Sequence, residues 1–75
     1  MAVGDEELAR LAGALTDIAE RLADVAIECL HDALAGGEAA DAAVATERRI
    51  TRARRAVEKA ALLLVPPEAI DDPFD

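Results

Sequence analysis

The strongest constraint on the fold is a stripe of apolar residues in the first half of the chain. Its members alternate in steps of three and four, the spacing that keeps side chains on one face of a helix in a coiled coil. The stripe consists of Leu8, Leu11, Leu15, Ile18, Leu22, Val25 and Cys29. It predicts one long helix that packs this face against a second helix.

Two pairs of residues interrupt the helical pattern. Gly36 can adopt the left-handed backbone that closes a helix, and Gly37 starts the return of the chain. The prolines at 66 and 67 stop the next helix. The predicted organisation is a helix over 5–35 with Asp5 as its N-cap, a turn over 36–37, a helix over 38–65 and an acidic, proline-containing tail over 66–75.

A two-residue connection makes the two helices antiparallel, so the predicted fold class is all-α, a two-helix hairpin. The second helix offers two rows of side chains to the first. One row is predicted to contain Ala43, Ile50, Val57 and Leu64, and the other Thr46, Ala53 and Ala60. Beside the main stripe, alanines recur every seven residues at 12, 19, 26 and 33, and small side chains of this kind let two helix axes approach closely.

The apolar content is small for a domain that folds alone. Of the 75 residues, nineteen are alanine and nine are leucine, so self-association or docking on a larger partner is expected. Three large apolar residues near the turn lie off the stripe and call for a second interface: Ile27, Leu30 and Leu34. A homodimer that forms a four-helix bundle would cover both sets. The residues predicted to carry assembly are therefore the stripe from Leu8 to Val25, these three, and Ile50, Val57 and Leu64.

The charges are unevenly distributed, although the net charge is −8. The bases cluster at Arg48, Arg49, Arg52, Arg54, Arg55 and Lys59. Antiparallel pairing brings Arg49 level with Asp24, and Arg55 near Asp17. Ion pairing within the hairpin is therefore favoured over nucleic-acid binding, with an acidic protein partner as the remaining alternative. Trp and Tyr are absent, which also disfavours stacking of nucleic-acid bases.

A row of acidic side chains offers a second interpretation, a metal site. Carboxylates one helical turn apart can share a divalent cation, and Glu28 with His31 has the Glu-x-x-His spacing of di-iron bundles. In a dimer, Glu47 could supply further carboxylates. The candidate metal ligands are Glu20, Asp24, Glu28 and His31. The competing interpretation is the solvated face of an amphipathic helix, and no cofactor other than a divalent metal is indicated.

The same region resembles a known family. The segment at 20–26, Glu-Arg-Leu-Ala-Asp-Val-Ala, is similar to the Glu-Arg-Ile-Gly-Asp-His-Ala segment of PhoU-type phosphate-signalling regulators. Val44, Glu47 and Ile50 are spaced like the Val-x-x-Asp-x-x-Ile pattern of that family. The resemblance implies an all-helical bundle in which Glu20 and Asp24 are metal ligands. It departs from the family at Val25, where the family has His.

Little in the chain points to catalysis. It contains one His, no Ser and no glycine-rich phosphate loop, so it is predicted not to be an enzyme. Cys29 is expected to fill the core, and the absence of a signal peptide or a membrane span predicts a cytoplasmic protein. In the tail, Ile70 and Phe74 could fold back on the bundle or dock on a larger protein. The predicted function is a small self-associating helical adaptor or regulatory subunit; the alternative is a metal-binding regulator or storage bundle.

Overall fold

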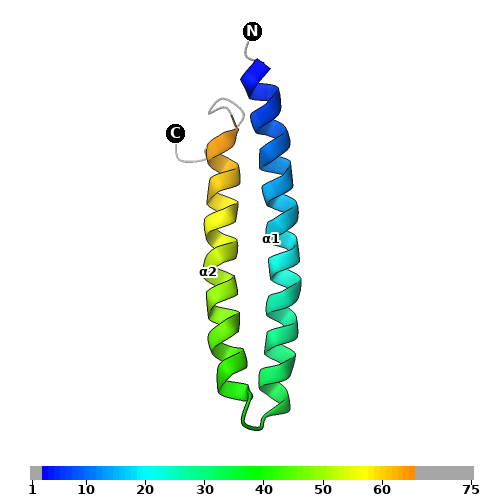
Figure 1. The fold of residues 1–75 in the computed structure, drawn as a ribbon, viewed down its shortest axis with the longest axis vertical. Coiled ribbons are helices and arrows are strands. Elements are labelled where there is room, and N and C mark those ends of the chain that lie inside the picture. The colour runs from blue at the N-terminus through cyan, green and yellow to red at the C-terminus, as the bar shows by residue number, and fades with distance from the viewer. Residues whose placement is uncertain (1–2, 66–75) are drawn as a thin grey trace, which may run out of the picture.

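The computed structural model describes residues 3–65 and contains two long helices joined by a short turn (Figure 1). Helix α1 spans Val3–Ala35 and helix α2 spans Ala40–Leu64. The helices lie side by side in opposite directions, with the turn at one end and the start of α1 and the end of α2 at the other. The structure confirms the all-α hairpin. Ile70 and Phe74 lie outside the described residues.

The helix boundaries differ from the predicted ones by about two residues. Helix α1 begins at Val3, so Asp5 lies in its first turn, where negative charge is favourable, and is not its N-cap. Helix α2 begins at Ala40. The two residues before it are used in a tight turn in which the Ala40 N–H donates to the Gly37 carbonyl oxygen at 3.2 Å. The connection is therefore four residues long, Gly36 to Ala39.

Both glycines of the turn adopt the left-handed backbone, with φ of 77° at Gly36 and 87° at Gly37. The Gly36 N–H donates to the Ala33 carbonyl oxygen at 3.2 Å, which closes the last turn of α1. This confirms the predicted conformation of Gly36. Glycine adopts a positive φ without steric cost, whereas most other residues are strained there. This explains why a Gly-Gly pair occupies the turn.

Helix α2 ends where the sequence places its prolines. Val65 has an extended backbone, with φ of −87° and ψ of 151°. A residue before proline is disfavoured in the helical region because the proline ring clashes with its backbone, so the helix stops at Leu64.

The contact between the two helices is built on alanine. Within residues 4–65 the buried side chains are Ala12, Ala19, Ala26 and Ala61, which are 4–9% exposed. Because each of these side chains is a single methyl group, the helix axes can approach closely. The hairpin alone therefore encloses very little apolar volume.

The predicted stripe on α1 is only half correct as the face that meets α2. Leu15, Leu22 and Cys29 are half-buried, as predicted. Leu11, Ile18 and Val25 are not: they are 46%, 45% and 42% exposed. The alanines one position later, at 12, 19 and 26, take their places against α2. The physical reason is that larger side chains in that row would hold the helices apart.

The rows of α2 show the same rotation. Ile50, Val57 and Leu64 are half-buried, which agrees with the first predicted row. The second row is wrong at two of its three positions, since Thr46 and Ala53 are exposed, whereas Ala60 is half-buried. The positions one residue later point toward α1 instead: Glu47 and Arg54 are half-buried and Ala61 is buried.

These two polar side chains differ in how their polar atoms are satisfied. The Thr51 hydroxyl donates to the Glu47 carboxylate, with 2.7 Å between Oγ1 and Oε1. Arg54 has a buried Nε that makes no hydrogen bond. An unsatisfied buried donor costs about 1–3 kcal/mol, so Arg54 is a point of weakness in the hairpin.

Candidate interaction surface

The exposed half of the stripe forms one side of an apolar surface that runs along the hairpin. We call it the long apolar face, and its residues are Leu8, Leu11, Ile18, Val25, Leu22, Thr46, Ile50 and Ala53. Leu22 of α1 shares a shallow hollow with Thr46, Ile50 and Ala53 of α2, which shows that the two helices contribute to the same surface. Four large side chains of this face, from Leu8 to Val25, are 37–46% exposed.

The face continues toward the turn as a second hollow. Cys29 and Asp32 of α1 line it together with Ala39, Ala43 and Thr46 of α2. Cys29 is half-buried and lines this hollow, so it lies at the edge of the contact between the helices and not in a closed core as expected. The other side chains that line this hollow are mostly alanine, so the apolar side chains of the long apolar face are smaller near the turn.

A separate apolar patch lies on the other side of α1. We call it the turn-end patch: Ile27, Leu30 and Leu34, which are 51%, 45% and 84% exposed. Each residue of a helix is rotated by roughly 100° from the one before, so these three lie roughly 140–200° around the axis from Val25. One partner seated on the long apolar face therefore cannot also cover the turn-end patch, which revises the expectation that a single homodimer contact covers both sets.

The predicted ion pairs between the helices do not form. Asp17 and Asp24 each precede a buried alanine by two residues, a rotation of roughly 200°, so they point away from α2. In residues 3–65 the structure contains one ion pair, between Arg10 and Glu7 within α1, at 3.4 Å. The prediction that Arg49 pairs with Asp24 and Arg55 with Asp17 is wrong, because residues at the same level of a hairpin need not face each other.

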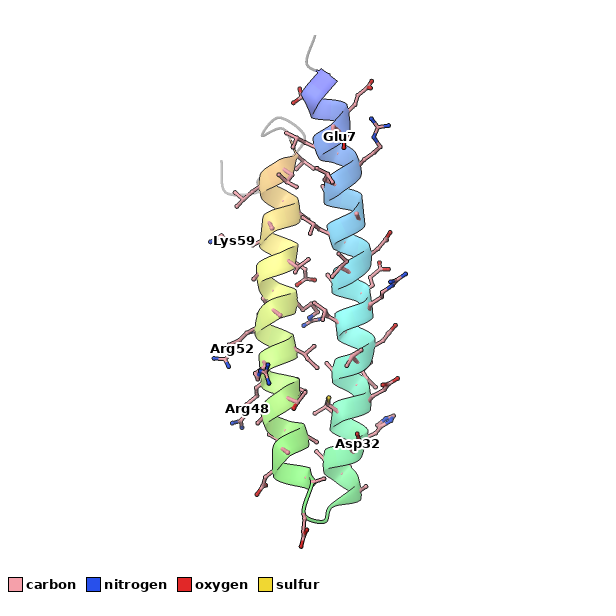
Figure 2. All side chains as sticks on the ribbon, viewed as in Figure 1. Glu7, Asp32, Arg48, Arg52 and Lys59 are labelled. Atoms are coloured by element: carbon pink, nitrogen blue, oxygen red, sulfur yellow. The ribbon has the colours of Figure 1, made fainter. Side chains whose placement is uncertain are left out.

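The bases of α2 are accordingly not neutralised by α1. Figure 2 shows Arg48, Arg52 and Lys59 on the side of α2 that is turned away from α1. Helix α1 carries eight acids and two arginines, a net −6, whereas α2 carries three acids and six bases, a net +3. The hairpin is thus one acidic helix beside one basic helix.

The candidate metal ligands lie along the exposed side of α1. Glu20, Asp24, Glu28 and His31 are all exposed. In the described part of the chain, no three His, Cys, Asp or Glu side chains come close enough together to hold a metal ion. Glu47, which was expected to add a carboxylate, is directed toward α1 and bonded to Thr51. A metal centre on these residues would require ligands from beyond the described part of the chain.

Comparisons of the chain with protein-family models, with curated proteins and with solved structures found no match. The resemblance to PhoU-type regulators therefore stays a prediction from the sequence. Among residues 3–65, neither helix combines the length and the apolar character that crossing a bilayer requires.

Proposed function

We propose that this protein is a small helical adaptor or regulatory subunit that acts by binding proteins, and that it first associates with a second copy of itself. One observation supports the proposal above the others. The hairpin buries only alanines in residues 4–65, while Leu11, Ile18 and Val25 remain more than 40% exposed.

The hairpin buries little apolar surface relative to the number of residues that it orders. Ordering a residue costs roughly 1.5 kcal/mol in conformational entropy. Each buried methyl group returns only about 0.8 kcal/mol. The hairpin adds only half-buried side chains such as Leu22 and Ile50 to its four buried alanines, so covering the exposed leucine, isoleucine and valine side chains would supply the stabilisation that it lacks.

A second hairpin placed on the long apolar face supplies that cover. Two hairpins packed face to face make a four-helix bundle, in which Leu22 and Ile50 lie near the centre. Because the dimer is symmetric, the same surface is used on both copies. No catalytic or cofactor chemistry is part of this proposal.

The turn-end patch gives the dimer a surface for a different partner. Ile27, Leu30 and Leu34 stay exposed when the long apolar face is covered, and exposed apolar clusters commonly mark protein-binding sites. The acidic tail, with Ile70 and Phe74, offers a further contact for a larger protein. We place this adaptor in the cytoplasm on the sequence grounds given above. The metal-binding alternative rests on the sequence pattern alone.

The test is sedimentation velocity on Ile18→Asp with Ala45→Asp as the matched control. Both positions are exposed in the hairpin, and both variants add one carboxylate to a helix. Ile18 lies on the long apolar face, whereas Ala45 lies on the far side of α2. We expect Ile18→Asp to sediment as a monomer or to unfold, and Ala45→Asp to behave as the parent protein. The proposal would be overturned if both variants formed dimers to the same extent as the parent protein.

A further inference from the structure

We propose that the two hairpins of the dimer lie with their turns at the same end, so that each α1 packs beside the α2 of the partner. This inference rests on the proposed function, since it specifies how the second copy occupies the long apolar face. The opposite arrangement, with the turns at opposite ends, would pack α1 beside α1 and α2 beside α2. Both arrangements bury the same face, and charge distinguishes them.

The charges of whole helices favour the first arrangement. Helix α1 has a net charge of −6 and helix α2 of +3. With the turns at the same end, every helix has two neighbours of opposite sign. With the turns at opposite ends, the two acidic helices become neighbours, and so do the two basic ones. Complementary charge of this kind fixes the orientation of a partner more than it adds affinity.

The rim of the long apolar face contains a specific pair of complementary side chains. Arg49 of α2 borders the hollow that contains Leu22. Glu28 of α1 follows Val25 by three residues, so it lies on the same side of the helix as the long apolar face. Both side chains are exposed. The single ion pair in residues 3–65 involves neither of them.

The levels of these two side chains also match. Cys29, the residue after Glu28, shares its hollow with Thr46, which precedes Arg49 by three residues. Measured away from the turn, Glu28 lies one residue beyond Cys29 and Arg49 three residues beyond Thr46, so the two lie about 3 Å apart along the bundle axis, within the reach of long side chains. With the turns at the same end, Glu28 faces the partner's Arg49, and the symmetry of the dimer makes this contact twice.

The first experiment measures the orientation directly. Spin labels are attached to Glu38→Cys, in the exposed turn, on a Cys29→Ala background, and the distance between the labels is measured by pulsed electron resonance. With the turns at the same end, the labels lie within about 30 Å, the width of a four-helix bundle. With the turns at opposite ends they lie about 50 Å apart, the length of a hairpin.

The outcomes separate the two proposals. A distance below about 30 Å is the expected result. A dimer with labels about 50 Å apart overturns the orientation and leaves the self-association intact. The absence of any dipolar coupling, together with the mass of a monomer, overturns both.

The second experiment tests the contact between Glu28 and Arg49 by charge reversal. We expect Glu28→Arg and Arg49→Glu each to weaken the dimer roughly 3- to 30-fold, since two exposed pairs are lost. The double variant should recover most of the affinity. An effect of net charge alone is distinguished by Glu28→Arg, because this variant lowers the magnitude of the net charge of −8 and would then strengthen the dimer. The control is Arg48→Glu, which makes the same change of charge on the outer side of α2 (Figure 2), at a residue that does not line the hollow containing Leu22. Additive weakening in the double variant would contradict the pairing.

Discussion

Enlarging one buried alanine tests the observed packing of the hairpin. Ala19 is 4% exposed between α1 and α2, so a Leu at this position adds three carbon atoms where no space exists. Overpacking of this kind typically costs about 1–3 kcal/mol. Ala45 is exposed on the far side of α2, and the same substitution there should change the free energy of unfolding by less than about 0.5 kcal/mol.

The assay is urea unfolding followed by the helical signal in circular dichroism. All three proteins are compared at one fixed concentration, because association contributes to apparent stability. We expect Ala19→Leu to lose about 1–3 kcal/mol relative to Ala45→Leu, or about 4–8 °C in Tm for each kcal/mol. The packing described for α1 is refuted if Ala19→Leu is as stable as Ala45→Leu.

Three further predictions concern the turn, the unsatisfied arginine and the turn-end patch. Gly36→Ala should lower the free energy of unfolding by about 1–2 kcal/mol through backbone strain alone, since no atom lies near an added Cβ. Gly13→Ala, in the middle of a helix, should raise the free energy of unfolding by about 0.5–1 kcal/mol. Thermal unfolding measures both variants, and equal effects would contradict the backbone conformation assigned to Gly36. Arg54→Met should stabilise the protein by about 1 kcal/mol in urea unfolding because it removes a buried donor without a partner. A destabilised variant would show that the guanidinium makes a stabilising contact. Leu30→Glu should keep the helical signal and the dimer mass in light scattering, and a monomeric variant would mean that the turn-end patch belongs to the dimer interface.

Much of the fold could be predicted from the sequence because its signals are local. The three-and-four spacing of leucines is specific to long packed helices, and a Gly-Gly pair between two such segments marks a turn. The structure agrees on both, and on the end of α2 before the prolines. The predicted start of α2 was two residues too early because Glu38 and Ala39 belong to the turn. Their place in the turn is fixed by backbone hydrogen bonds, which amino-acid composition does not reveal.

The face that each helix turns toward the other could not be predicted in the same way. Leu15 and Leu22 belong to two overlapping stripes, one that continues through Ile18 and one that continues through Ala19. Both have heptad spacing. Burial of large side chains favours the first stripe, and close approach of the axes favours the second, so the choice depends on packing between the two helices.

The charged residues show a second limit of sequence reasoning. Pairing by level along the hairpin placed Arg49 beside Asp24, but the direction in which each side chain points depends on the rotation of its helix. Asp24 lies on the side of α1 opposite to α2, two residues from the buried Ala26. The rotation that exposed Val25 and the other large apolar side chains is also the rotation that separated these charges.

The measurement that tests the central claim most directly is native mass spectrometry of the full chain at micromolar concentration. The account predicts a dimer, with twice the 7.9 kDa mass of one chain and no mass in excess of the polypeptide. A monomer over the whole concentration range would contradict self-association through the long apolar face. Stoichiometric extra mass that EDTA removes would instead favour the metal-binding alternative on Glu20, Asp24, Glu28 and His31.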